Sequence, residues 1–172
     1  MTLELDSHAN TTFLGRGALT IFDNELPVNV QEYDPALGAK EYRTVSGVLA
    51  SIQPFTGVRY HLIINKAVHM PDLKHHLLFT MQYRADNVQV NDYPGMYYKD
   101  PTEESHDIVT QDDNDENVIL PFFLSGMTSH INVESPSRDE FELHRCPRTT
   151  LTNADLTWDP SATIYEDQEN AC

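Results

Sequence analysis

Two long extended segments, 42–52 and 58–70, limit this chain to a β-rich fold more than any other feature of its sequence. Both are rich in Val, Ile and Leu, and residues 53–57 between them contain a proline and a glycine that are typical of tight turns. Pairing across this turn predicts a β-hairpin at the centre of a sheet. The chain of 172 residues also contains ten prolines, at intervals too short for a helical bundle. We therefore predict an all-β fold.

One short helix is expected within this fold. Leu73, Leu77, Leu78 and Met81 recur at helical spacing after a proline, which predicts a helix over 74–84. Shorter strands are predicted at 2–5, 19–22, 28–30, 88–90, 106–109, 117–124 and 127–133.

The acidic run at 111–116 is interpreted as the solvated tip of a hairpin, because it lacks the spaced ligands and central glycine of an EF-hand calcium loop. No hydrophobic period is visible beyond residue 134. Residues 1–133 are therefore expected to form the folded domain, and 134–172 a disordered acidic tail or polyprotein connector.

Charge and cysteine content narrow the class of protein. The net charge of -16 repels phosphate backbones and anionic membranes, so we expect no direct nucleic-acid or membrane partner. No apolar run is long enough to span a bilayer, and the N-terminus lacks the pattern of a signal peptide. With two cysteines and no disulfide framework, the expected location is the cytoplasm.

The first predicted strand runs directly into Asp6, which is followed by Ser7, His8, Ala9 and Asn10. A strand that delivers an Asp, then a small hydroxyl residue, and then Ala two positions later resembles the Asp-Thr/Ser-Gly-Ala active-site turn of retropepsins. The ordinary alternative for this short pattern is a plain Asx-turn.

A second segment strengthens the resemblance. Residues 66–78 carry Pro71, Leu73, Leu77 and Leu78 in the spacing of the Val-Leu-x-Val-Pro-x-Leu-x-x-Asn-Leu-Leu-Ser stretch of copia-type retrotransposon proteases. Between the two segments, 43–49 resembles the hairpin region from which such enzymes build the flap over the substrate. The resemblance covers residues 3–90 and extends less closely to 133.

The resemblance implies a retropepsin-like closed β-barrel and an aspartic endopeptidase of a retrotransposon polyprotein. Its implied catalytic residues are Asp6 and Ser7, and its implied substrate-binding residues are Ala9, Asn10, Val45, Ser46 and Gly47. A polypeptide is the implied substrate, and no cofactor or metal is expected.

The chain carries half of such an active site. Aspartic proteases need two carboxylates that share a proton, and Asp6 is the only Asp followed by Ser or Thr. Activity therefore requires a two-fold homodimer. The resemblance implies that this dimer lies within a retrotransposon virus-like particle in the cytoplasm. In the family, the hydroxyl after the Asp bonds across the dimer.

Two departures from the family pattern keep an alternative open. His8 stands where the family has Gly, and only five residues precede Asp6, where retropepsins have another strand. The second departure suggests an N-terminally truncated piece of a longer polyprotein. The alternative function is a catalytically inactive fragment that acts as a binding or dimerisation module.

Metal binding and cysteine chemistry are the remaining alternatives. His61, His69, His75 and His76 are close in sequence, with His144 and Cys146 further on, but no zinc motif such as His-Glu-x-x-His or Cys-x-x-Cys is present. Histidines that face solvent or form hydrogen bonds are the default interpretation. Cys146 lies in the expected tail and lacks a positioned base, so it is not expected to act as a nucleophile.

Overall fold

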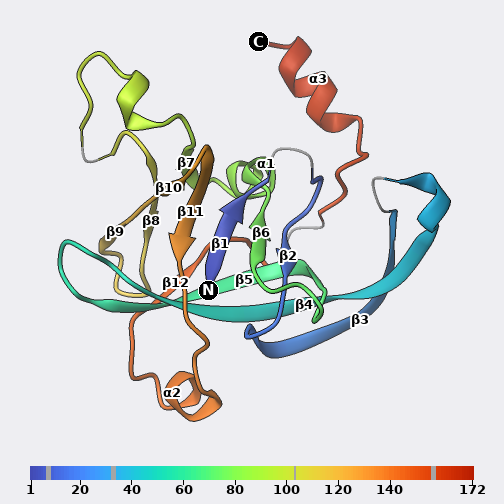
Figure 1. The fold of residues 1–172 in the computed structure, drawn as a ribbon, viewed down its shortest axis with the longest axis horizontal. Coiled ribbons are helices and arrows are strands. Elements are labelled where there is room, and N and C mark those ends of the chain that lie inside the picture. The colour runs from blue at the N-terminus through green and yellow to red at the C-terminus, as the bar shows by residue number, and fades with distance from the viewer. Residues whose placement is uncertain (7–8, 32–33, 103, 156–157) are drawn as a thin grey trace.

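The computed structural model describes residues 1–6, 9–31, 34–102, 104–155 and 158–172 (Figure 1). The strands are β1 Thr2–Leu5, β2 Phe13–Leu14, β3 Leu19–Gln31, β4 Ala39–Ile52, β5 Arg59–His69, β6 His76–Leu78, β7 Gln89–Asn91, β8 Asp107–Gln111, β9 Asn117–Pro121, β10 Phe123–Ser125, β11 Thr128–Asn132 and β12 Arg148–Thr150. The helices are α1 Thr80–Ala85, α2 Arg138–Glu142 and α3 Ile164–Asn170, with 3-10 turns η1 Pro35–Leu37 and η2 Gly95–Tyr97.

Most of these elements are strands, which confirms the prediction of a β-rich fold. They form a large sheet in the order β10-β11-β1-β6-β2-β5-β4-β3, with β12 added beside β5, and a small sheet β7-β8-β9. The large sheet ends at β10 and at β3, and these two strands do not pair. The predicted closed barrel is therefore not found among the described residues.

The predicted central hairpin is confirmed. β4 pairs antiparallel with β5 from Arg43 opposite His69 to Ile52 opposite Arg59. The turn between them closes with a hydrogen bond from the N–H of Gly57 to the carbonyl oxygen of Gln53 at 2.8 Å. Gly57 has a φ of 72°, a backbone conformation that other residues seldom adopt.

A second, longer hairpin joins β3 to β4, and its outer part extends away from the other strands at the right of Figure 1. The predicted break between 22 and 28 is instead a shift of register between Asp23 and Pro27 within one continuous strand. The ladder resumes with Pro27 opposite Arg43, and β3 is an edge strand, where a proline without an N–H is tolerated.

The predicted helix over 74–84 is wrong in its first half. His76–Leu78 form β6, which lies between β1 and β2, and α1 begins only at Thr80. The backbone of β6 pairs in parallel with Leu3–Leu5 of β1, and Leu78 is completely buried. Tertiary pairing on both edges has overridden the helical spacing of the leucines.

The small sheet contains the hairpin predicted around the acidic run. β8 pairs with β9 from Asp107 to Gln111, and residues 112–116 form the turn. The Asp112 carboxylate accepts hydrogen bonds from the N–H groups of Asn114 and Glu116 at 2.8 and 3.0 Å. The run thus forms a turn that is held by the side chain of Asp112, as expected.

The prediction of a disordered tail at 134–172 is also wrong, because much of this segment packs against the rest of the fold. β12 pairs in parallel with β5, and the buried Thr152 side chain accepts from the N–H of Asn65 at 2.6 Å. The packing residue Leu151 is completely buried. The segment joins the sheet through a three-residue strand and side-chain hydrogen bonds, which leave no hydrophobic period in the sequence.

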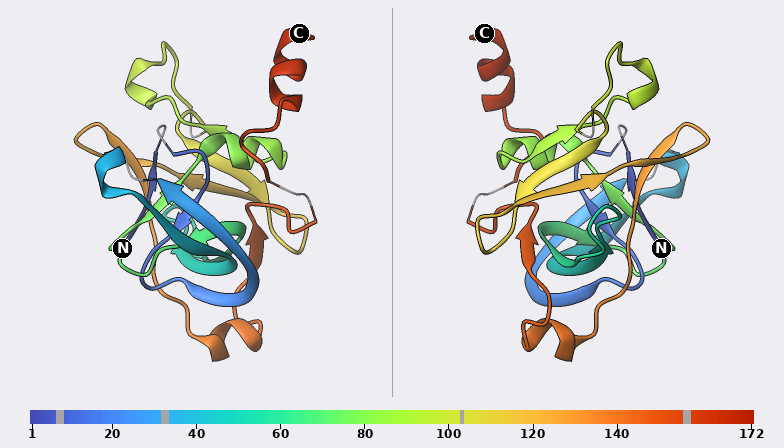
Figure 2. Two further views of the ribbon diagram at one scale, coloured as in Figure 1. Left: turned by 90° about the vertical axis from the view of Figure 1, so that its right-hand side faces the viewer. Right: turned by 90° about the vertical axis from the view of Figure 1, so that its left-hand side faces the viewer.

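The two sheets share one core, in which Leu3, Leu62 and Leu78 of the large sheet lie in the same cluster as Ile108 and Leu120 of the small one. Figure 2 shows the two sheets from either side. In the described part of the chain, no helix has the length and apolar content needed to cross a membrane.

Candidate active site

Asp6 lies immediately after β1, where that strand ends beside β6. Its N–H donates to the carbonyl oxygen of Leu78 at 3.0 Å, which continues the parallel pairing by one residue. Asp6 is thereby fixed next to Phe79, the residue that precedes α1. Ser7 and His8 lie outside the described residues.

The loop that begins at Asp6 ends at Thr12, and Thr12 is held by the same short segment of chain. Thr12 is completely buried. Its hydroxyl oxygen accepts from the N–H of Phe79 at 3.3 Å, and its own N–H donates to Oε1 of Gln82 at 2.9 Å. Both ends of the Asp6 loop are therefore anchored within 78–82.

Gln82, which bonds Thr12, is also hydrogen-bonded to the large sheet. Its side chain is completely buried in α1, and its Nε2 donates to the carbonyl oxygen of Lys66 in β5 at 3.2 Å. One amide thus connects α1, the end of the Asp6 loop and β5. A buried amide with both ends bonded gives a position that resists displacement.

An open groove of about 1100 Å³ lies beside this loop. Its walls come from the residues after the loop, from β3, from the inner strands and from the C-terminal segment: Ala9, Asn10, Thr11, Phe13, Phe22, Asn24, Leu26, Pro27, Val28, Asn29, Val30, Gln31, Thr44, Lys66, Val68, Ala154, Asp155, Trp158, Pro160 and Ser161. The indole N–H of Trp158 donates to the carbonyl oxygen of Asn10 at 3.2 Å, which joins two of these walls.

The edge of β3 and the side chains beside it suit an extended peptide. β3 is the last strand of the large sheet, so within the described residues its outer edge carries backbone N–H and C=O groups that no further strand pairs. Phe22 and Leu26 on this strand are 63% and 64% exposed. An unpaired strand edge with apolar side chains beside it is the kind of surface to which an extended peptide adds.

Only two of the five substrate-binding residues predicted from the sequence line the groove. Ala9 and Asn10 line the groove. Val45, Ser46 and Gly47 lie in β4, are buried, and are not among the residues that line it. A Cβ on Gly47 would come 2.4 Å from Cδ1 of Leu14, so the environment of Gly47 is core packing.

Sequence reasoning missed the residues of β3 that form one wall of the groove. The alternation at 28–30 identified a strand, but only its pairing with β4 reveals which edge it leaves open. Lys66 and Trp158 were missed as well, since they reach the groove through contacts distant in sequence.

The clustered histidines occupy separate environments. His76 is completely buried, and its Nδ1 accepts from the N–H of Gly15 at 3.0 Å. Nε2 of His75 lies 3.6 Å from Oε2 of Glu4. Among the described residues, the group whose spacing suits a metal ion is His61 with Glu140 and Cys146.

Comparisons with known proteins give no family for this chain: no protein-family model, no curated protein and no solved structure matches it.

Proposed function

We propose that this chain is one subunit of a homodimeric aspartic endopeptidase of the retropepsin kind found in copia-type retrotransposon polyproteins. The observation that carries the proposal is the set of hydrogen bonds around Asp6. Asp6 directly follows β1, and its N–H donates to the carbonyl oxygen of Leu78 in the parallel strand β6. Thr12, at the end of the loop that follows, is hydrogen-bonded to Phe79 and to Gln82 of α1. These contacts support a fixed position for the backbone that carries one carboxylate.

One Asp6 per chain supplies half of the catalytic pair. In the dimer, the two Asp6 carboxylates approach to about 3 Å and share one proton. The ionised member removes a proton from water as its oxygen attacks the peptide carbonyl, and the protonated member donates to the developing oxyanion. By resemblance, the Ser7 hydroxyl bonds across the two-fold axis and fixes both loops.

The proposed substrate is a polypeptide in extended conformation. The groove lined by Ala9 and Asn10 supports this choice, because β3 offers apolar side chains there and backbone groups that no described strand pairs. Asp6 itself is not among the residues that line the groove. Binding through the main chain gives affinity for many sequences, and the side-chain contacts set the preference.

The flap expected at 43–49 lies within β4, where 45–49 are buried. The outer end of the hairpin of β3 and β4 is therefore proposed as the flap that covers the bound chain. This end carries η1, in which the Asp34 side chain accepts from the N–H of Ala36 at 2.9 Å. Leu37, the last residue of this turn, is 62% exposed. A turn with its own side-chain cap and an exposed apolar residue suits closure over a substrate.

The test compares wild type with Asp6→Asn on a library of unfolded peptides, with cleavage read by mass spectrometry. Asp100→Asn is the matched control, because Asp100 is an exposed carboxylate in the loop after η2. Sedimentation measures the fraction of dimer in each sample. We expect cleavage by wild type and Asp100→Asn, and none by Asp6→Asn at the same dimer fraction.

Equal cleavage by Asp6→Asn would refute the proposal. A wild-type dimer that cleaves nothing, and that fails to bind a statine-type mimic of the tetrahedral species, would favour the alternative of an inactive dimerisation module.

A further inference from the structure

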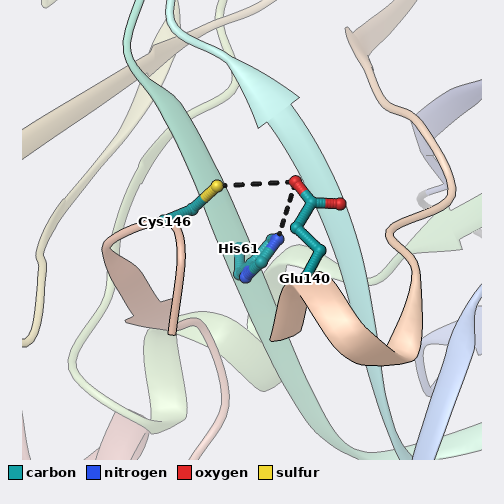
Figure 3. Close-up of side chains that lie close together, drawn as sticks. All are labelled: His61, Glu140 and Cys146. Atoms are coloured by element: carbon teal, nitrogen blue, oxygen red, sulfur yellow. Dashed lines mark hydrogen bonds and ion pairs between the residues drawn. The ribbon is translucent and has the colours of Figure 1, made fainter. Parts of the chain in front are cut away.

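Three side chains with metal-binding atoms converge on the side of β5 that faces α2 (Figure 3). His61 comes from β5, Glu140 from α2 and Cys146 from the connection to β12. Nε2 of His61 lies 3.4 Å from Oε1 of Glu140, and Sγ of Cys146 lies 3.5 Å from the same oxygen. One ligand atom from each residue lies within 4.8 Å of the other two.

His61 is the member of this group that most needs an explanation. Its side chain is completely buried. Neither of its ring nitrogens has a hydrogen-bond partner in the described part of the chain, since the contact of Nε2 with Glu140 has the distance of an ion pair without hydrogen-bond geometry. A buried nitrogen pair without partners costs free energy unless another group is bound there.

Two of the three spacings between these atoms match the edges of a tetrahedron around zinc. With zinc bonds of about 2.0 Å to nitrogen and oxygen and about 2.3 Å to sulfur, a tetrahedral site has edges of about 3.3 Å between N and O and about 3.5 Å between S and O. The observed separations are 3.4 and 3.5 Å. The third edge, between the His61 nitrogen and Sγ of Cys146, is within 4.8 Å, and an ion at the centre would draw these two atoms to about 3.5 Å.

The local fold already holds the three residues in this arrangement. The N–H of His61 donates to the carbonyl oxygen of Pro147 at 2.9 Å, which fixes the residue after Cys146 against β5. Glu140 belongs to a capping box with Ser137, whose hydroxyl oxygen accepts from the N–H of Glu140 at 3.1 Å. Contacts of this kind orient metal ligands before the ion arrives.

Charge at the site is compatible with a divalent cation. Nε of Arg59 bonds Oε1 of Glu140 at 2.6 Å, so Arg59 competes for that oxygen. Arg59 also pairs with Glu134, which would keep it neutralised if the ion displaced it from Oε1.

A surface depression of about 470 Å³ reaches one of the three ligands. It is lined by Ser137, Asp139, Glu140 and Arg145, so Glu140 can be approached from outside.

We propose that His61, Glu140 and Cys146 bind one zinc ion, with water as the fourth ligand, and that the ion clamps the segment from α2 to β12 onto β5. The role is structural, and no step of peptide hydrolysis is assigned to it.

The test uses full-length chain, reduced and stripped with EDTA, in three forms: wild type, Cys146→Ser and Cys172→Ser. Cys172 is the exposed second cysteine, so its variant is the matched control. Metal analysis after dialysis against zinc measures stoichiometry, and cobalt(II) in place of zinc reports thiolate ligation through its sulfur-to-metal absorption band. Glu140→Gln, which keeps the shape of the side chain, tests the carboxylate.

We expect one zinc per chain and the cobalt–thiolate band in wild type and Cys172→Ser. Cys146→Ser should lose the band, and Glu140→Gln should bind zinc at least tenfold more weakly. Zinc at 100 times its Kd should raise the Tm of Cys172→Ser by about 5 to 10 °C and leave that of Cys146→Ser unchanged. If Cys146→Ser does not fold, wild type and Cys172→Ser still decide the matter. No stoichiometric zinc, no thiolate band, or equal zinc binding in both cysteine variants would overturn the proposal.

Discussion

Replacing Gln82 by leucine should release the end of the Asp6 loop. The change removes the acceptor of the Thr12 N–H and the donor to the Lys66 carbonyl oxygen, at 2.9 and 3.2 Å. A buried backbone group left without a partner costs about 1–3 kcal/mol, and the first of these two is fully buried. The added apolar surface of leucine offsets part of the sum. We expect a net loss of about 3 kcal/mol in the free energy of unfolding.

Urea unfolding measures this loss, with Gln89→Leu as the matched control. Gln89 is exposed in β7, so the same chemical change there should alter the free energy of unfolding by less than about 0.5 kcal/mol. In a chain of this size the Gln82 variant should melt about 6–12 °C below wild type. If both variants unfold at the wild-type urea concentration, the anchoring role of Gln82 is refuted.

Three further predictions test how the fold is held together. Gly15→Ala should destabilise the chain by more than about 1 kcal/mol, because the added Cβ would lie 2.5 Å from a backbone carbonyl oxygen. Gly95→Ala is the control, since a Cβ there meets no atom within 4 Å. Equal melting temperatures for the two variants would contradict this prediction. Burial lowers the pKa of His76 from 6.5 to about 4, so the unfolded chain binds a proton first as pH falls. The free energy of unfolding should then be unaffected above pH 6.5 and should drop by up to about 1.4 kcal/mol per pH unit from there to pH 4, a slope that urea titrations should find reduced in His76→Gln. Thr152→Val should cost about 1–3 kcal/mol by removing bonds to the backbone of β5 at 2.6 and 2.7 Å, while the exposed Thr150→Val should be near neutral in the same urea assay.

The local parts of the fold were predictable from the sequence. Alternation in 42–52 and 58–70, with a turn of matching length between them, was sufficient for the central hairpin. The acidic turn at 111–116 was predictable for the same reason, because pairing across a short connection depends on neighbouring residues.

Long-range pairing was not predictable. Leu77 and Leu78 fit a helical period, but β6 is recruited as a strand by β1, more than 70 residues earlier in the chain. The segment around Thr149 joins β5 through polar residues, and no hydrophobic pattern marks such a strand. Local propensity contains no information about either partner.

The candidate sites also contain some residues that the sequence identified and others that only long-range contacts bring together. Asp6 was predictable from a strand that ends in an Asp, and its proposed catalytic role stays a prediction. The anchors Thr12 and Gln82 are separated by 70 residues and have no motif that connects them. His61, Glu140 and Cys146 lack the spacing of any zinc motif, so only the folded chain brings them together.

Mixing wild type with Asp6→Asn tests most directly the central claim that each chain carries half of one active site. The two forms are unfolded together, refolded to exchange subunits, and assayed at constant total protein. If two Asp6 carboxylates are required, activity follows the square of the wild-type fraction, so an equal mixture retains about one quarter of the activity and an equal mixture with Asp100→Asn retains all of it. Activity that falls in simple proportion to the wild-type fraction would contradict the account, because each chain would then act alone.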